Sequence, residues 1–468
     1  MMTLSLAVRN LLRNRRRSVA TLLALAVGIS SLLLFGGYSA DIRYGMMTGY
    51  VRSGGHLQVQ HRDYFLYGSG NPTAYAIRDY DRIIAAIRND PELSRMVTVV
   101  SPTLLFGGIA GNYDAGVSRT VIGTGLVATD VNRMRAWNEF DVAVPSLRFA
   151  LEGAPADAAI VGIGVARVLL LCEAIGLSNC PRPAVEAAAK GPALPADIAA
   201  LSAVEEKADR KAKAAAPPAR ARIELLAGHG RGTPNVAALQ VVAAEDQGLK
   251  ELDEVSVIVH LKQAQQLVFS RSAPKATSLM IQVARTAQMP KAAARLRTLL
   301  AEVAPDQTLA VLDFATLNPF YVQTMDLFDT IFGFIFVLIG GIVLFTVSNT
   351  MNAAVTERTN EIGTLRSIGL RQAGIRRLFV MEGFLLGATG AVVGVSSALL
   401  LSVAINRMGL TWLPPGGSEP LPLTVRVWGE TAMMAGTAFG MVLIGAVSAW
   451  WPAYRAARLK IVDALRHA

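Results

Sequence analysis

Residues 355–371 read Val355-Thr-Glu-Arg-Thr-Asn-Glu-Ile-Gly-Thr-Leu-Arg-Ser-Ile-Gly-Leu-Arg371. Two apolar stretches border this loop, residues 328–349 before it and residues 379–405 after it. Each stretch is long enough to cross a bilayer as a helix, which needs about 20 residues. A short charged loop between two such stretches predicts a membrane protein.

Two further apolar stretches of spanning length lie at residues 18–40 and 431–451, and 52% of the 468 residues are hydrophobic. The first and second stretches are separated by residues 41–327, which resemble an ordinary globular domain. The other connections, 350–378 and 406–430, are short. The sequence therefore predicts a membrane protein of four transmembrane α-helices with a large α+β domain inserted between helices 1 and 2.

The positive charge is concentrated in three short segments. Residues 1–17 contain no acidic residue, the loop 350–378 has five Lys/Arg against two acids, and the tail 452–468 has four against one. Residues 41–329 hold 29 of each sign, so a nucleic-acid-binding domain is excluded as the source of the net charge of +10. The positive-inside rule predicts that the three segments are cytoplasmic and that the large domain is periplasmic. The arginines before the first stretch are Arg9, Arg13, Arg15, Arg16 and Arg17.

The segment 1–17 also shows helical spacing of Leu4, Val8, Leu11 and Leu12. An amphipathic helix is predicted, with its arginines at the cytoplasmic membrane surface against anionic lipid. A simple topology signal is the alternative, and the two are compatible. The first stretch is expected to be an uncleaved anchor because its apolar run is longer than that of a signal peptide.

The large domain combines two hydrophobic periods. Alternation of apolar and polar residues predicts strands, and helical spacing predicts amphipathic helices. The predicted strands lie around Leu57–Val59, Val255–Leu261 and Leu279–Val283, and the predicted helices around Ile83–Ile87 and Leu296–Val303.

The middle of this domain, about residues 150–225, is predicted to be an insertion that divides it into two lobes, because the composition there shifts to Ala, Lys, Glu and Pro. The two cysteines of the chain, Cys172 and Cys180, lie in this range. An oxidising compartment predicts a local disulfide between them, and two free thiols are the alternative.

Enzyme motifs give little support to a catalytic role. The segment Val121-Ile-Gly-Thr-Gly-Leu-Val-Ala128 half resembles a dinucleotide fingerprint, but it lacks the third glycine and a tight turn is predicted instead. No G-x-x-x-x-G-K-[ST] occurs, so ATP is expected to bind to a separate polypeptide. The five histidines are scattered, and neither a metal site nor a catalytic site is expected.

The loop 355–371 itself predicts a short helix. Glu357 and Glu361 are one helical turn apart, Ile362 and Leu365 share a face, and Gly369 is a natural helix stop. A helix with one charged and one apolar face between two membrane spans can dock into a groove on a partner. A solvated connector with incidental charge is the alternative.

Several segments together resemble a known family. The loop Glu357–Gly369, Phe379-Val-Met-Glu-Gly383 and the tail motifs Pro452-Ala-Tyr-Arg-Ala-Ala-Arg458 and Asp463-Ala-Leu-Arg466 resemble the FtsX-type permease module of ABC transporters. The N-terminal Arg9-Asn-Leu-Leu-Arg-Asn-Arg15 and Ser53-Gly-Gly-His-Leu-Gln-Val59 are similar to the LolC/LolE and MacB branch of that family.

The resemblance implies that the loop is a coupling helix that contacts a separate ABC ATPase dimer in the bacterial inner membrane. ATP and Mg would belong to that partner, with no cofactor on this chain, and a second permease chain, identical or related, would complete the unit. Glu382 is predicted to form a structural ion pair near Arg376 and Arg377, with a gating role as the alternative. The residues expected to contact the ATPase are Glu357, Arg358, Glu361, Ile362, Leu365, Arg366 and Gly369.

The expected function is mechanotransmission. ATP-driven movement of the coupling helix would rearrange the periplasmic domain and move lipoprotein or another hydrophobic cargo from the inner membrane. MacB carries its ATPase on the permease chain, and this sequence shows no such domain, so the cargo of MacB is not transferred. A regulatory platform that controls a cell-envelope enzyme without transporting cargo is the alternative.

Overall fold

The computed structural model describes residues 6–459 apart from 8, 11, 12, 14, 69, 144–147, 178–220, 229–233, 249, 271 and 413–419. The chain forms two compact units. The helical unit comprises Met1–Met46, Phe320–Trp412 and Leu421–Ala468, and the sheet unit comprises Met47–Pro319 and Leu413–Pro420.

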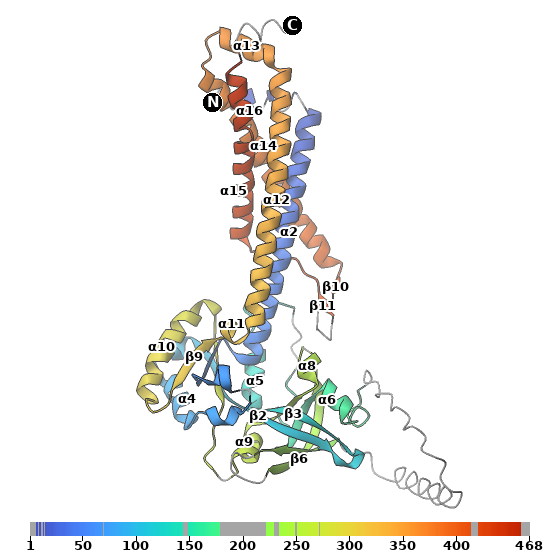
Figure 1. Ribbon diagram of the computed structural model, residues 1–468, viewed down its shortest axis with the longest axis vertical. Coiled ribbons are helices and arrows are strands. Elements are labelled where there is room, and N and C mark those ends of the chain that lie inside the picture. The colour runs from blue at the N-terminus through green and yellow to red at the C-terminus, as the bar shows by residue number, and fades with distance from the viewer. Residues whose placement is uncertain are drawn as a thin grey trace, which may run out of the picture. The chain divides into compact units, whose positions relative to one another are not determined.

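Long apolar helices build the helical unit (Figure 1). In the described part of the chain, four helices are long and apolar enough to cross a membrane, with α15 and α16 counted as one. Each extends beyond the apolar stretch predicted from the sequence, because polar residues continue the helix at its ends. They are α2 (Arg15–Gly54), α12 (Pro319–Glu357), α14 (Gln372–Arg407), and α15 (Thr431–Ser448) with α16 (Trp450–Ala457).

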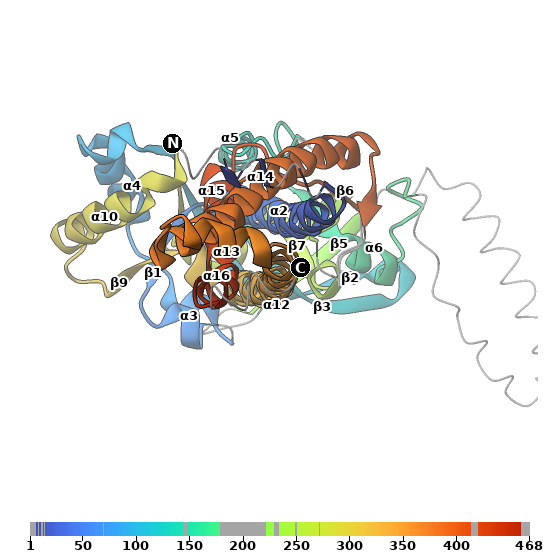
Figure 2. The ribbon, with the colours of Figure 1, turned by 90° about the horizontal axis from the view of Figure 1, so that it is seen from above.

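Small residues allow these helices to approach closely, and Figure 2 shows them grouped when seen from above. A Cβ added at Gly394 of α14 would lie 2.7 Å from Cβ of Ile29 on α2. A Cβ added at Gly383 of α14 would lie 2.5 Å from Cβ of Ala449 and 2.8 Å from the carbonyl oxygen of Gly445. Contact through small residues is the usual way in which helices associate in lipid.

In the described part of the sheet unit, nine strands form one sheet that is accompanied by several helices. The strand order is β3-β7-β4-β6-β5-β2-β8-β1-β9, and β2 also pairs with β3. That extra pairing closes six strands into a ring. The strands are β1 (Leu57–His61), β2 (Val97–Asn112), β3 (Val117–Leu126), β4 (Ala158–Gly162), β5 (Arg222–Ala227), β6 (Asn235–Glu245), β7 (Ser256–His260), β8 (Ser278–Val283) and β9 (Leu309–Asp313).

The long strand β2 belongs to two hydrophobic cores. Its first part pairs with β8, and from Leu104 onward it pairs with β3. One core packs α4 and α10 against the β1, β8 and β9 side, and the other fills the ring of six strands together with α9. The helices of this unit include α3 (Tyr64–Tyr67), α4 (Tyr80–Asn89), α5 (Ala128–Arg135), α6 (Ile163–Val168), α8 (Lys250–Asp253), α9 (Leu261–Phe269), α10 (Met289–Val303) and α11 (Phe314–Leu317).

The chain enters and leaves this unit through two neighbouring strands. Helix α2 ends at Gly54, and β1 begins at Leu57 after Gly55, whose φ of +79° favours glycine. Strand β9 is followed by the short helix α11 and then by α12. Because Leu57 pairs directly with Asp313, the two strands joined to the long helices lie side by side.

The strands and helices predicted from periodicity are confirmed in β1, β7 and β8 and in α4 and α10. The tight turn predicted at residues 121–128 is wrong, because Val117–Leu126 forms strand β3. Gly123 is needed there for packing, since a Cβ would lie 2.2 Å from the ring of Phe106. The predicted insertion, residues 150–225, is too wide, because β4, α6 and β5 within it belong to the ring of strands and its core.

Candidate functional site

The loop between α12 and α14 forms a short helix, α13 (Thr359–Ser367), which is separated from α12 by Arg358 alone. The predicted stop at Gly369 is confirmed, because this residue adopts a φ of +101°. The N–H of Leu370 donates to the carbonyl of Leu365 at 3.0 Å, and the N–H of Gly369 donates to that of Arg366 at 3.1 Å. This pair of bonds is the Schellman motif, which satisfies the last carbonyls of a helix.

A buried ion pair fixes the start of α13. Nη1 of Arg358 lies 3.1 Å from Oε1 of Glu382 on α14, and the two side chains are only 6% and 3% exposed. The sequence-based expectation that Glu382 pairs with Arg376 or Arg377 is wrong. The packing of the helices instead places the Glu382 carboxylate opposite Arg358, which lies 24 positions earlier in the sequence.

Asn10 is the third member of this buried group. Its Nδ2 donates to Oε1 of Glu382 at 2.7 Å, and its carbonyl accepts from Nη2 of Arg358 at 3.1 Å. Buried charges are tolerated when they are paired and hydrogen-bonded, and here both Nη atoms of Arg358 have a partner, whereas its Nε has none among the described residues. We call Asn10, Arg358 and Glu382 the Arg358 network, and its effect is to hold α13 in place.

Two exposed ion pairs lie beside this network. Nη2 of Arg13 lies 2.5 Å from Glu361, and Nη2 of Arg17 lies 2.7 Å from Glu357. All four side chains are between 39% and 55% exposed, so each pair is worth only about 0–1 kcal/mol. These contacts orient the N-terminal segment along the loop.

The other predicted membrane-surface residues, Arg9, Arg15 and Arg16, are exposed. Their role at a lipid surface remains a prediction. The apolar residues Leu4, Val8, Leu11 and Leu12, on which the predicted amphipathic helix depends, lie outside the described residues.

The apolar face of α13 is buried within the chain. Ile362 is 3% exposed and joins the core of the helical unit, and Leu365 packs against that core. Nη1 of Arg366 donates to the carbonyl of Leu459, just after α16. These three residues and Arg358 therefore anchor α13 internally, and any contact that they make with a partner remains a prediction.

The outer surface of α13 offers different residues. Glu357 and Glu361 are half-exposed, and Ile368 and Leu370, which flank Gly369, are 79% and 41% exposed. Sequence reasoning missed Ile368 and Leu370 as contact candidates. The sequence does carry a signal for them, because each lies next to Gly369, the glycine that ends the helix. Both residues therefore lie beyond the last buried turn of α13.

One of the two cysteines of the predicted disulfide, Cys172, lies within the described residues. Cys172 packs, partly buried, against the core of the six-stranded ring. Cys180 lies outside the described residues, so its pairing with Cys172 stays a prediction.

Comparison with known proteins agrees with this architecture. Residues 330–461 match the FtsX-like permease C-terminal family. The chain is 35% identical over 143 residues to the macrolide export ATP-binding/permease protein MacB of Shigella boydii serotype 4, covering 31% of this chain and 20% of that protein. It is 39% identical over 128 residues to MacB of Nitrobacter winogradskyi, covering 27% and 17%, and 34% identical over 161 residues to MacB of Shewanella sp. strain W3-18-1, covering 33% and 22%.

The matched segment spans about a fifth of the length of these curated relatives. The family match over residues 330–461 covers most of α12, the buried Arg358, the whole of α13 and the helices α14 to α16. These helices are long and apolar enough to embed the protein in a membrane. Residues 330–461 of the chain therefore form an FtsX-like permease C-terminal domain, and about a third of the chain is similar to MacB-type permeases.

Proposed function

We propose that this chain is the permease subunit of an ABC transporter and that α13 is the helix through which a separate ATPase acts on it. One observation carries this proposal: α13 is fixed to the chain by buried contacts and still presents an exposed apolar tip at Ile368. A solvated connector needs neither a buried ion pair nor an exposed isoleucine. A docking helix needs both, because force on its tip must reach the helices behind it.

The route of that force follows from the covalent order of the elements. Only Arg358 separates α13 from α12, and the Arg358 network ties the same point to α14. Helix α12 has 39 residues and α2 has 40, so each is about 60 Å long. At their far ends, α2 leads into β1, and α12 is joined to β9 through the short helix α11; β1 and β9 are paired. Movement of α13 would thus reach the sheet unit through two stiff helices.

The orientation and partners belong to the same proposal. The Lys/Arg excess in the loop 350–378 favours a cytoplasmic α13 and a periplasmic sheet unit in the bacterial inner membrane. ATP and Mg would bind to a dimer of the ATPase subunit, and a second permease chain, identical or related, would complete the assembly. The relatives are ATP-binding/permease proteins, which supports an ATP-driven partner for this chain.

The cargo is proposed to be lipoprotein or another hydrophobic molecule of the inner membrane. The apolar character of the four long helices supports this, because a hydrophilic path through them would need polar residues along the bundle. Depletion of the protein should cause such cargo to accumulate in the inner membrane. A cell-separation or cell-wall defect without accumulation would instead indicate a regulatory platform.

The test replaces Ile368 with a charged residue in the full-length chain, reconstituted with the ATPase subunit that co-purifies with it. Ile368→Asp should lower the permease-dependent ATPase rate at least about tenfold, because it places a charge at the centre of an apolar contact. Val236→Asp is the matched control, since Val236 is also an exposed apolar residue, on β6 of the sheet unit. An unchanged rate for Ile368→Asp would contradict the assignment of α13.

A further inference from the structure

The first part of β2 has an open edge. Residues Val97 to Thr103 pair with β8 on one side, whereas pairing with β3 on the other side begins only at Leu104. Within the described residues, no strand pairs with that second edge between Val97 and Thr103. An open strand edge presents backbone N–H and C=O groups that can hydrogen-bond to another chain.

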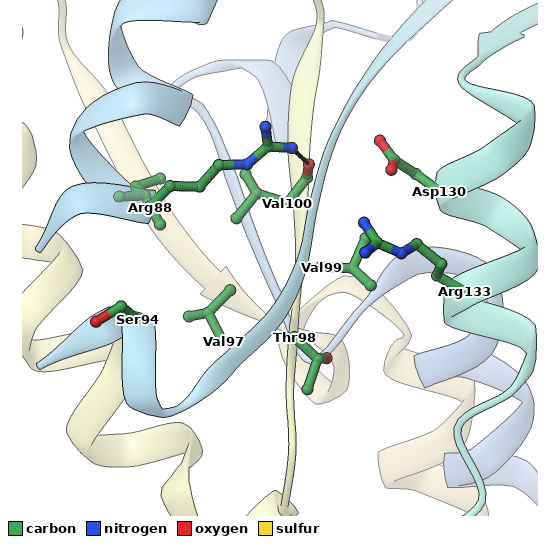
Figure 3. Close-up of a pocket in the computed structure, with 9 residues that line it drawn as sticks. Arg88, Ser94, Val97, Thr98, Val99, Val100, Asp130 and Arg133 are labelled. Carbon is green, nitrogen blue, oxygen red and sulfur yellow. Dashed lines mark hydrogen bonds between the residues drawn. The ribbon is translucent and has the colours of Figure 1, made fainter.

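The direction of the backbone groups identifies which residues face this edge. Nη2 of Arg88, on α4, donates to the carbonyl of Val100 at 3.4 Å, as Figure 3 shows. The carbonyl of Thr103 faces β8 instead, where it accepts from the N–H of Thr277 at 2.8 Å. Because backbone groups alternate between the two edges of a strand, Pro102 also faces the open edge. A proline is tolerated at an edge, since it has no N–H to leave unpaired.

A pocket of about 240 Å³ lies along this edge. Four consecutive strand residues, Val97–Val100, form one wall, and the other lining residues come from α4, α5 and the turn before β2. This volume is below the roughly 300 Å³ at which typical small-molecule pockets begin. It therefore suits a short part of a chain that runs on beyond the pocket. The remaining lining residues are Ile87, Arg88, Ser94, Asp130 and Arg133.

The charged side chains of the pocket have little to bind within the protein. Within the described residues, the Arg88 side chain makes a single hydrogen bond, which is long for its type, and the residue is exposed. Arg133 is exposed, and among the described residues it makes no hydrogen bond or ion pair. Asp130, one turn earlier on α5, is only 9% exposed and is likewise without a side-chain hydrogen bond in the described part of the chain. Figure 3 shows both residues extending from α5 toward β2.

We propose that this edge of β2 binds an extended segment of a partner polypeptide as an added strand, and that an acidic side chain of the segment pairs with Arg88 and Arg133. The N–H and C=O of Val100 would bond to the backbone of the segment. Arg88 would exchange its long bond to the Val100 carbonyl for a carboxylate. Two arginines against one aspartate leave the lining with one net positive charge, which one acidic residue complements.

Protection of the edge against aggregation accounts for part of this arrangement. A proline, an irregular register between Val97 and Val99, and a nearby arginine are all features that discourage strand pairing. They do not account for Arg133 and Asp130, which make no bonds to this strand. They also leave space beside the strand, whereas protection would fill it. The proposal is separate from the role of α13, because it concerns only the sheet unit.

The test uses the full-length chain in detergent micelles and the fluorescein-labelled peptide acetyl-Thr-Val-Glu-Val-Thr-amide as probe. Fluorescence anisotropy should show saturable binding at least about tenfold tighter than that of the same peptide with Gln in place of Glu. A third peptide, methylated on alternate backbone nitrogens, should bind at least about tenfold more weakly, because it cannot donate to the strand. Arg133→Glu should remove the preference for the acidic peptide. Arg297→Glu, at an exposed position on α10, is the matched control and should keep it.

Three results would overturn the proposal. Equal binding of the Glu and Gln peptides would show that the arginines do not select a carboxylate. Undiminished binding of the methylated peptide would show that no strand is added. Concentration-dependent self-association of the chain that Arg133→Glu abolishes, measured by light scattering, would show that a second copy covers this edge.

Discussion

Arg358 and Glu382 form a buried ion pair at 3.1 Å between the residue that precedes α13 and the first third of α14. The carbonyl and the amide of Asn10 bond to the same two side chains. Three parts of the chain that are remote in sequence therefore share one buried polar group. Removal of any one member leaves the others buried without a full set of partners, and the stability cost is expected to be large.

Replacement of Arg358 alone should destabilise the protein much more than replacement of Arg358 and Glu382 together. Arg358→Met leaves the Glu382 carboxylate buried without its cation and should lower the free energy of unfolding by about 3–5 kcal/mol. The double variant Arg358→Met with Glu382→Met should recover much of that loss, because no charge stays buried. Thermal denaturation of the full chain in one detergent measures both.

Arg377→Met is the control for this pair of variants. Arg377 is exposed on α14, so its replacement should change stability by no more than about 0.5 kcal/mol. A double variant as unstable as Arg358→Met would show that the buried charge is not the cause.

His56 should make the protein less stable in mild acid. The ring is fully buried, its Nδ1 accepts from the N–H of Val283 at 3.2 Å, and it packs edge-on against Trp137 at 4.8 Å. Burial lowers the pKa of His56 to about 4, against 6.5 for the unfolded chain. The unfolded state therefore binds an extra proton between these two values, and stability should fall by about 3 kcal/mol as the pH drops from 6.5 to 4.

The measurement is a denaturation series from pH 8 to pH 4 on the full chain and on His56→Gln. The difference in free energy of unfolding between the two proteins should be constant above about pH 6.5. It should shrink below that pH, because His56 binds a proton on unfolding and Gln does not. A difference that stays the same down to pH 4 would contradict the burial of a neutral His56.

Asp90 should be essential to the packing of α10 on α4. Its buried carboxylate accepts from Nε and Nη2 of Arg295 at 2.9 and 2.6 Å and from the backbone N–H of Glu92 and Leu93 at 3.0 and 2.9 Å. Asp90→Ala removes all four bonds and should cost about 3–5 kcal/mol. Glu92→Gln, which breaks the exposed pair with Lys291, should cost less than about 1 kcal/mol.

The guanidinium of Arg295 and these backbone donors lower the pKa of Asp90 below its ordinary value. The carboxylate then stabilises the fold above the unfolded pKa of about 3.9, and this contribution is lost as the pH falls toward the folded pKa. The denaturation midpoints of Asp90→Ala and Glu92→Gln, measured in the same buffer and down to low pH, distinguish the loss of the buried Asp90 bonds from the loss of the exposed Glu92 pair. Equal losses for Asp90→Ala and Glu92→Gln would refute the prediction.

Glycines on the long helices should differ sharply in their tolerance of a methyl group. Gly383→Ala would place a Cβ 2.8 Å from a backbone oxygen of α15, which cannot move aside as a side chain can, so a loss of about 1–3 kcal/mol is expected. Gly341→Ala on α12 has nothing within 4 Å and should be neutral or stabilising by up to about 1 kcal/mol. Thermal denaturation of the two variants compares them, and similar midpoints would rule out close packing of α14 on α15.

Sequence reasoning found the elements with strong periodic signals. The apolar stretches coincide with long helices, because a run of apolar residues is unambiguous. Strands such as β1 and helices such as α10 have a clear period of two or of 3.6 residues. The turn predicted at residues 121–128 is wrong, because two glycines close together favour a turn locally. In the folded chain, Gly123 lies in a strand, where the ring of Phe106 leaves no room for a Cβ.

Partners of side chains were the least predictable feature. Proximity in sequence predicts that Glu382 pairs with Arg376 or Arg377, but its partners are Arg358 and Asn10. A buried carboxylate binds whatever donor the packing of the helices brings to it, and this depends on helix rotation. The extent of exposure of Ile368 cannot be read from local sequence for a similar reason, since it depends on where α13 ends against the core.

The sequence by itself determined the four apolar helices, the position of the loop between the second and third, and the helix stop at Gly369, because length, apolarity and a glycine act locally. Only the tertiary structure decided that Arg358 is buried against Glu382, that six strands close into a ring, and that the first part of β2 keeps an open edge. These features depend on contacts between residues far apart in the chain. Local pattern carries no information about such contacts, because their energies arise only when the elements pack together.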